Sequence, residues 1–259
     1  MFKCNYPLFK SGRILKSGML EELRDYPREF INIKYSGYSN GIIAGCDIDV
    51  MDNFIIIKKG IIKYEENIYM LTKDCPVKYE NNNVLTSLKL KFMPAHNDGD
   101  YIKNETEIYL DENIETEEYE MELCRFKLRI GANLRRNYVS FIDFSTEFDT
   151  VNIINTPFSA YGESSLSPYI LRSFGLEMLK CNLNENFDIT FSCLCVQCKE
   201  TIEKDIIVSY IINKLNIKDK EYTNEEIYNY LAQILESRKY GQDSSQGHGR
   251  GKYKKIVID

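Results

Sequence analysis

Residues 41–72 read GIIAGCDIDVMDNFIIIKKGIIKYEENIYMLT, and this stretch decides the fold class. Short runs rich in isoleucine and valine are divided by turn residues at positions 51–53, 59–60 and 65–67. Runs of this length at this regular spacing are typical of antiparallel strands that follow one another in a meander. The stretch therefore predicts a β-rich first half of the chain.

Further strands are expected downstream. In residues 87–92, SLKLKF, leucine and phenylalanine alternate with lysine, so one face is expected in a core and the lysine face in water. Beyond a polar loop at about residues 94–100, two more strands are predicted over 106–112 and 118–130. The apolar residues of the last strand change parity near Leu123, which predicts a β-bulge there.

A short helix is expected before the strands. Ser17 can act as its N-cap, and the helix is predicted to stop after Tyr26 because Pro27 follows.

The second half of the chain carries stronger helix signals. Ser167 before Pro168 places a capping hydroxyl ahead of a proline at the first helical position. Residues 187–198 fit both a strand period and a helical face. Helix is favoured because Asn184 can cap it and because helices flank it. Thr223 followed by Glu226 forms the pattern of a capping box at the start of a last helix.

These elements predict an α+β fold. An antiparallel β-meander in the N-terminal half is followed by a small helical C-terminal region and an extended tail. The expected regions are residues 1–40, an N-terminal arm with a short helix; 41–160, an antiparallel β domain; 161–237, a helical domain; and 238–259, a flexible linker and C-terminal arm.

The charge and hydropathy of the chain exclude some classes of binding partner. The chain has 259 residues and a formal net charge of −6, whereas nucleic-acid binders usually carry a basic excess, so no nucleic-acid partner is expected. The opening MFKCNYPLFKSGR lacks the apolar core of a signal peptide, and the longest apolar run, residues 206–212, is too short to span a bilayer. We therefore expect synthesis in the cytoplasm and no membrane insertion.

The cysteines favour a structural interpretation. Eight cysteines in a cytoplasmic chain are expected to be reduced and to behave as small apolar side chains. Cys193, Cys195 and Cys198 lie close in sequence, with Cys181 as the only nearby fourth ligand, but on a helix Cys193 points away from the other two. Core packing is therefore expected, with no metal and no cofactor. A disulfide in an extracellular form stays an open alternative.

Candidate catalytic groups are few. His96 lies in a polar turn and His248 in the predicted linker, so neither has a scaffold for a catalytic triad. The sequence also lacks a GxxxxGK[ST] loop and a GxGxxG turn at a strand–helix junction. The chain is therefore predicted not to be an enzyme.

Residues 105–122 hold nine carboxylates and no basic residue. Their alternation with apolar residues indicates the solvated face of a strand, and a docking surface for a basic partner is the alternative. The tail KYKKIVID has strand composition and a basic character that suit an arm of a neighbouring copy. The candidate partner-binding residues are Glu115, Glu117, Glu118, Lys252, Tyr253, Lys254, Lys255, Ile256 and Val257.

A family resemblance covers roughly residues 40–215. Residues 122–180, ELCRFKLRIGANLRRNYVSFIDFSTEFDTVNIINTPFSAYGESSLSPYILRSFGLEMLK, carry most of it, together with GCDIDVMDNFIIIKKGIIKYEENIYML at 45–71. The chain resembles baseplate proteins of contractile phage tails and of R-type, phage-tail-like bacteriocins of Gram-positive bacteria. The resemblance contains no short catalytic signature.

The resemblance implies a structural component of a contractile tail baseplate. Its partners would be other baseplate proteins in a symmetric multi-subunit assembly, with a link from the core to tail fibres as a further implied role. After synthesis in the bacterial cytoplasm, it would become part of the released phage tail or bacteriocin particle.

Two other functions remain alternatives at this point. A receptor- or cell-wall-binding module at the tail-fibre level could use some of the nineteen tyrosines as platforms for sugars. A wall hydrolase acting through the carboxylates would need two of them held in a shaped cleft.

Overall fold

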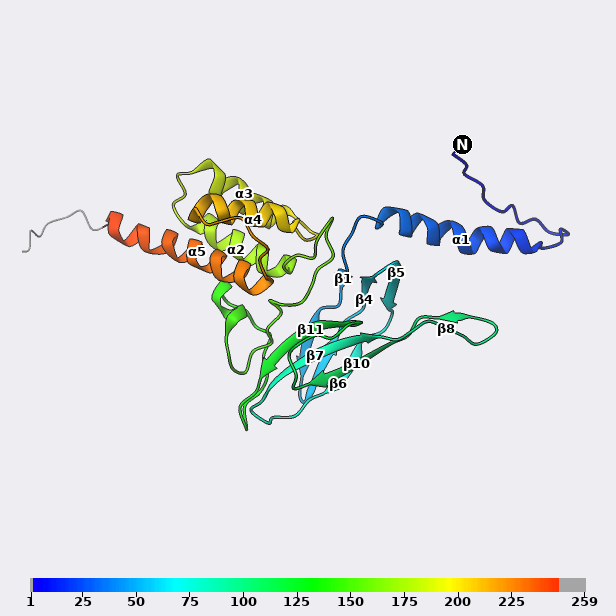
Figure 1. The fold of residues 1–259 in the computed structure, drawn as a ribbon, viewed down its shortest axis with the longest axis horizontal. Coiled ribbons are helices and arrows are strands. Elements are labelled where there is room, and N and C mark those ends of the chain that lie inside the picture. The colour runs from blue at the N-terminus through cyan, green and yellow to red at the C-terminus, as the bar shows by residue number, and fades with distance from the viewer. Residues whose placement is uncertain (1, 247–259) are drawn as a thin grey trace, which may run out of the picture.

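The first six strands, β1 to β6, form three long antiparallel strands. Each long strand is bent in its middle and consists of two consecutive strands: β1 and β2, β3 and β4, or β5 and β6. The computed structural model (Figure 1) describes residues 2–246. The strands are paired in the orders β1-β4-β5 and β2-β3-β6. Their bounds are β1 Gly41–Gly45, β2 Ile48–Met51, β3 Phe54–Ile57, β4 Gly60–Tyr64, β5 Asn67–Leu71 and β6 Cys75–Lys78.

Backbone hydrogen bonds continue across the bend between these two sheets. The Cys46 N–H donates to the Lys59 carbonyl at 3.1 Å, and the Lys58 N–H donates to the Asp47 carbonyl at 2.8 Å. The expected meander is therefore present, with turns near residues 51–53 and 65–67. The third predicted break, at residues 59–60, is a bend within one long strand rather than a turn, and β6 was not expected.

Two glycines allow the bend. Gly45 and Gly60 are cross-strand partners, and Gly45 has a φ of +65°, in the region that favours glycine. A Cβ at Gly60 would overlap the backbone nitrogen and the thiol of Cys46, so the two backbones could not approach as they do.

The second half of the β region is a sheet of order β10-β7-β11, with β7 Leu85–Phe92, β10 Thr106–Asp111 and β11 Glu120–Lys127. The predicted bulge is confirmed, because the β7–β11 register shifts between Glu122 and Cys124. The loop expected at about residues 94–100 contains one short strand, β8 His96–Asn97, and a second, β9 Ile102–Lys103, follows it. These extend the β7–β10 hairpin into a finger that projects from the sheet (Figure 1).

Residues 144–158, the FSTEFDTVNIINTPF phrase, join the β region to the helices. Phe144 is buried in the helical core, Val151 is buried in the β core, and Ile153 packs against both. The segment also exchanges backbone hydrogen bonds of 2.8 Å between Asn152 and Arg125 of β11. The phrase that carries the resemblance is thus the connector between two hydrophobic cores.

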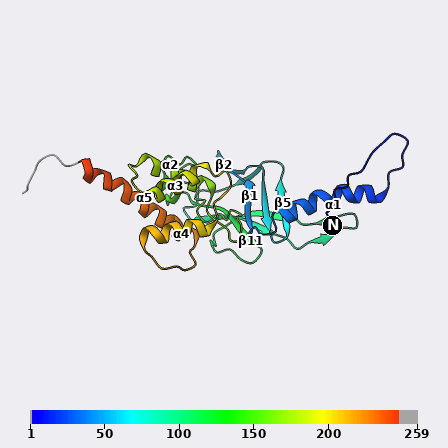
Figure 2. The ribbon, with the colours of Figure 1, turned by 90° about the horizontal axis from the view of Figure 1, so that it is seen from above.

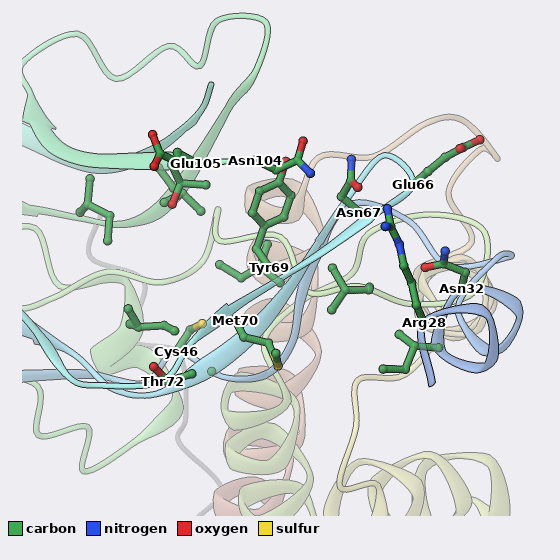
Figure 3. A pocket seen from close by; sticks show the side chains of 18 of the residues that line it. Arg28, Asn32, Cys46, Glu66, Asn67, Tyr69, Met70, Thr72, Asn104 and Glu105 are labelled. Atoms are coloured by element: carbon green, nitrogen blue, oxygen red, sulfur yellow. The ribbon is translucent and has the colours of Figure 1, made fainter. Parts of the chain in front are cut away.

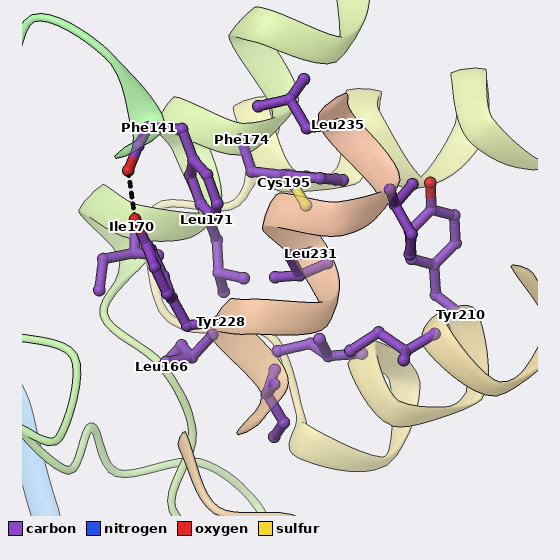
Figure 4. Close-up of a cluster of buried hydrophobic side chains, with 14 of the residues drawn as sticks. Phe141, Leu166, Ile170, Leu171, Phe174, Cys195, Tyr210, Tyr228, Leu231 and Leu235 are labelled. Atoms are coloured by element: carbon purple, nitrogen blue, oxygen red, sulfur yellow. Dashed lines mark hydrogen bonds between the residues drawn. The ribbon is translucent and has the colours of Figure 1, made fainter. Parts of the chain in front are cut away.

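The helices of the C-terminal half form one bundle around Phe174 (Figure 4). It comprises a 3-10 helix η1 Phe141–Ser145, α2 Pro168–Lys180, α3 Asn186–Gln197, α4 Lys204–Leu215 and α5 Asn224–Gln246. The hydroxyl of Tyr228 donates to the Phe141 carbonyl at 2.7 Å and so ties α5 to η1 (Figure 4).

The predicted starts of α2 and α5 are confirmed, whereas α3 has Glu185 rather than the expected Asn184 as its N-cap. Ser167 caps α2 by accepting from the Tyr169 N–H at 3.3 Å, and Thr223 and Glu226 make reciprocal capping contacts at the start of α5. Residues 187–198, which fitted two periods, lie almost wholly in α3. The antiparallel α+β class expected from the sequence is the fold observed.

The last helix continues into the stretch that was predicted as linker, ending at Gln246. The reason is electrostatic. Arg238 lies 2.9 Å from the buried carboxylate of Asp188 and 2.6 Å from Glu185, while Lys239 pairs with Glu177 at 2.5 Å. These pairs hold residues 238 and 239 to the bundle.

The first helix, α1 Ser17–Lys34, is longer than predicted. Its N-cap is Lys16 rather than Ser17, and Pro27 lies inside it instead of ending it at Tyr26. A proline inside a helix removes one backbone hydrogen bond without always terminating the helix. No residue of α1 is buried, and the helix lies at the opposite end of the molecule from α5 (Figures 1 and 2).

All eight cysteines are free thiols. Cys46, Cys124 and Cys195 are buried, and burial raises the pKa of Cys46 and of Cys195 to about 12. Cys193 is exposed on α3 while Cys195 is buried, as the helical arrangement predicted. Among the described residues, every helix is too short or too polar to cross a membrane.

The bend yields a test of the fold. We expect Gly60→Ala to lower the free energy of unfolding by about 1–3 kcal/mol, because the added methyl group overpacks the contact with Cys46. Urea denaturation followed by circular dichroism measures this. Gly18→Ala is the matched control, since a Cβ there meets nothing within 4 Å. Equal unfolding midpoints for the two variants would show that the bend tolerates a side chain.

Candidate docking surfaces

The lysine face of β7 is covered instead of lying in water. The sequence placed Lys89 on a solvated face, yet its side chain is 0% exposed, whereas Lys91 on the same face stays exposed to a large extent. The difference is the loop of residues 112–119 between β10 and β11, which folds over Lys89. Sequence reasoning missed this because the loop comes from a distant part of the chain.

Carboxylates and one carbonyl surround the Lys89 ammonium group. It donates to Asp111 Oδ2 at 2.8 Å, to the Glu115 carbonyl at 2.5 Å and to Glu120 Oε2 at 3.4 Å. Glu120 also accepts from the Tyr109 hydroxyl and from the Glu117 N–H, the latter at 3.0 Å. With these partners, the hydrogen-bonding capacity and the charge of the buried Lys89 are matched. Its contacts also fix the path of residues 112–119, which we call the acidic loop.

The charges shift one another's titration. Burial alone would lower the pKa of Lys89, but the hydrogen bond to Asp111 and the charge of Glu120 outweigh it and raise that pKa. The hydrogen bond from Lys89 lowers the pKa of Asp111. Burial pushes the pKa of Glu120 upward, and the bonds from Tyr109 and the Glu117 N–H leave it lowered. All three groups are therefore charged at neutral pH.

Glu115, Glu117 and Glu118, the predicted partner-binding carboxylates, lie together on this loop with exposed side chains. They are not on a strand face, as the alternating pattern had indicated, but in the connection between two strands. Among residues 2–246, no basic side chain forms an ion pair with any of them. The predicted basic partner residues, Lys252 to Val257, lie outside the described residues.

A pocket of about 520 Å³ lies beneath this loop. Its lining includes Glu117, Glu118, Glu120, Glu122 and Arg125. Arg125 donates to Glu122 through two nitrogens at 2.8 and 2.6 Å, so that carboxylate is neutralised internally. Glu115, Glu117 and Glu118 are therefore exposed carboxylates with no ion pair among the described residues, and Glu112 of the same loop is exposed as well. Within the described residues, no group of three or more histidine, cysteine or acidic side chains is arranged to hold a metal ion.

A larger groove of about 900 Å³ lies between α1 and the sheets (Figure 3). Its floor contains the buried side chains of Ile62, Leu90 and Leu123. Arg28 from α1 lies on one side and Glu105 on the other, with charged and amide groups at the rim.

Two edge strands form the walls of this groove. Tyr69 and Met70 come from β5, at the edge of the first sheet, and Thr106 and Ile108 come from β10, at the edge of the other. Edge strands present unpaired backbone donors and acceptors, which accept an added strand from another chain. The groove therefore combines an apolar floor with two hydrogen-bonding walls, an arrangement suited to an extended segment of a protein partner.

Sequence reasoning did not find the groove. β5 and β10 are far apart along the chain, and nothing local in either strand shows that the other borders the same space. Met70 lies in an apolar run of the sequence, and only the structure shows that its side chain is exposed.

Comparisons with known proteins give only a distant likeness. No family model and no curated protein sequence matches the chain significantly. One similar solved structure is a chain from the type VI secretion system TssK–TssF–TssG baseplate subcomplex, with 10% identity and a TM-score of 0.43, covering 90% of this chain and 100% of that chain. A second is TssK, with 6% identity and a TM-score of 0.39, covering 92% of this chain and 72% of that chain. At these TM-scores the likeness carries no inference about function.

The Lys89 cluster predicts a pH-dependent stability. We expect Lys89→Met to lower the free energy of unfolding at pH 7 by about 3–5 kcal/mol, because Asp111 and Glu120 lose their buried counter-charge. Carboxylates with lowered pKa values stabilise the fold above their unfolded pKa values of about 4, and this contribution is lost as the pH falls through their folded values. The difference in free energy of unfolding between the unaltered chain and the variant should therefore shrink as the pH falls below about 4.

Urea titrations at several pH values measure both effects. Lys91→Met is the control, because Lys91 is exposed and lies 3.9 Å from Glu120, and we expect a change of about 0.5 kcal/mol or less. A deficit for Lys89→Met that is no larger than that of the control, or that is constant with pH, would contradict the cluster's role.

Proposed function

We propose that this protein is a structural component of the baseplate of a contractile injection system, where it holds neighbouring subunits together. The sequence resemblance over roughly residues 40–215 supports this role. The observation that carries it is the N-terminal part of the chain, in which α1 has no buried residue. An exposed apolar segment of this size marks an interaction surface in a soluble protein.

The apolar side chains of this part are exposed along its whole length. The most exposed of them are Phe2, Tyr6, Leu8, Phe9, Ile14, Leu15, Leu20, Leu23, Tyr26, Phe30 and Ile33. Leaving them in water gains nothing for folding, whereas covering them on assembly removes apolar area from water. Such a segment is suited to a subunit that works among neighbours.

The groove between β5 and β10 adds a second surface of the same kind. In this proposal it takes an extended segment of an adjoining baseplate protein, which would complete the two open sheet edges by backbone hydrogen bonding. Glu115, Glu117 and Glu118 add a charged surface that would orient a basic partner.

The finer assignment is to a phage tail or an R-type, phage-tail-like bacteriocin of Gram-positive bacteria. It rests on the sequence resemblance, as do a link to tail fibres and a final place in the released particle after synthesis in the bacterial cytoplasm. A loosely similar structure is also named a baseplate subcomplex, but of a type VI secretion system, and that likeness is too weak to add support.

Particle composition tests the proposal. We expect the protein in purified particles, and we expect Met70→Asp combined with Ile102→Asp to reduce its incorporation roughly tenfold or more, because both exposed side chains line the groove. Quantitative mass spectrometry of particles measures incorporation. Val139→Asp, at an exposed apolar position that does not line the groove, is the matched control.

Three outcomes decide the question. Absence of the unaltered protein from intact particles would overturn the baseplate role, and incorporation equal to that of the control would exclude the groove. Retention of the isolated protein on cell walls would favour the alternative function, a receptor- or cell-wall-binding module.

The acidic loop and the basic tail make a separate prediction. We expect Glu115, Glu117 and Glu118 changed together to Gln to weaken assembly without lowering the melting temperature, because these side chains are exposed. Changing Lys252, Lys254 and Lys255 to Gln should have a similar effect. If the tail of one copy binds the loop of another, the combined variant should be no worse than either alone, as a double-mutant cycle would show. Additive losses would instead mean separate partners.

A further inference from the structure

The exposed apolar residues of α1 follow a heptad repeat. Met19, Leu23, Tyr26, Phe30 and Ile33 are separated by four, three, four and three residues. Their exposed fractions run from 48% at Leu23 to 74% at Ile33, with Met19 partly covered. This spacing keeps one apolar stripe facing a partner helix in a left-handed coiled coil. We call these five residues the α1 seam.

The opposite side of α1 faces the body of its own chain. Arg24, Pro27, Arg28, Ile31 and Asn32 line the groove described above, and none of them belongs to the α1 seam. The proline that interrupts the backbone hydrogen bonding of the helix is therefore on the groove side. The α1 seam runs past it unbroken, and none of its residues lines the groove. At the C-terminal end of the α1 seam, Ile33 lines a smaller pocket together with Lys63 and Ile68 of the sheet, although its side chain is 74% exposed.

We propose that α1 forms a parallel coiled coil with α1 of further copies of this chain. In heptad terms, Leu23 and Phe30 occupy a positions, and Met19, Tyr26 and Ile33 occupy d positions. Each would insert as a knob between side chains of the neighbouring helix. The inference does not depend on the baseplate role, because it concerns self-association of the isolated protein.

The flanking charges favour a second copy in the parallel orientation. Glu22 and Glu29 take g positions, and Lys34 takes an e position. In a parallel pair, Glu29 of one helix lies beside Lys34 of the other, and the symmetry repeats this contact. In an antiparallel pair, g positions face g positions, so Glu22 would meet Glu29 and the like charges would repel.

The place of α1 in the fold permits this association. The helix projects from the end of the molecule that lies opposite the bundle (Figures 1 and 2). At 18 residues it is about 27 Å long, only a few turns, so we expect weak association that depends on protein concentration.

Analytical ultracentrifugation of the full chain tests the proposal. We expect the mass to rise from that of one 30.3 kDa chain to a multiple of it as the concentration increases. Leu23→Glu combined with Phe30→Glu should leave a monomer at every concentration. Because no residue of α1 is buried, the melting temperature should be unchanged. Glu21→Lys, at a position away from the α1 seam, is the control and should associate like the unaltered chain.

Charge exchange tests the orientation. Glu29→Lys and Lys34→Glu should each weaken association roughly tenfold, because attraction becomes repulsion at each symmetric contact, and the two together should restore it. A parallel coiled coil is overturned if Glu29→Lys strengthens association. Self-association through α1 is overturned if the unaltered chain stays monomeric up to about 200 µM, or if the α1 seam variant associates equally well. Incorporation into particles with a monomeric isolated chain would leave the baseplate role standing while this proposal fails.

Discussion

The buried ammonium group of Lys89 is the constraint on which the β region's outer surface depends. A charge with no exposure to water must be matched by opposite charge and by hydrogen-bond acceptors, and these come from Asp111, Glu120 and the carbonyl of Glu115. The match fixes the loop over the sheet and leaves Glu117 and Glu118 with their side chains outward. The need to pair the buried Lys89 ammonium group thus places an acidic loop on the outside of the protein. The positive charge of Lys89 beneath the loop offsets the repulsion among the carboxylates.

The connector of residues 144–158 joins the β region to the helical bundle through both hydrophobic cores. It places Phe144 in one core and Val151 in the other, and its Thr156 hydroxyl donates to the Leu123 carbonyl at 2.8 Å, at the bulge of β11. The β region and the bundle are therefore coupled through buried side chains as well as through the chain itself. Many residues of this short segment are buried or make hydrogen bonds to β11. This gives a physical reason why the segment carries so much of the sequence resemblance.

Local features were predictable from the sequence, and features that depend on distant contacts were not. The capping residues of α2 and α5, the bulge at Leu123 and the turns of the meander are set by residues within a few positions of each feature. The burial of Lys89 needed a loop more than twenty residues away, and the groove needed two strands from different sheets. The helix beyond Pro27 was missed for another reason, because proline weakens a helix by a finite free energy that later residues can offset.

The two kinds of surface differ in how they are supported, and this decides what assembly can do to the protein. The acidic loop and the strand walls of the groove are parts of the packed body, so a partner meets them preformed and little ordering entropy is lost on binding. The helix α1 contributes no buried side chain to either core, so its association with another chain can be gained or lost without changing the stability of the body. A subunit built in this way can join an assembly stepwise, with its folded body intact before, during and after each contact is made.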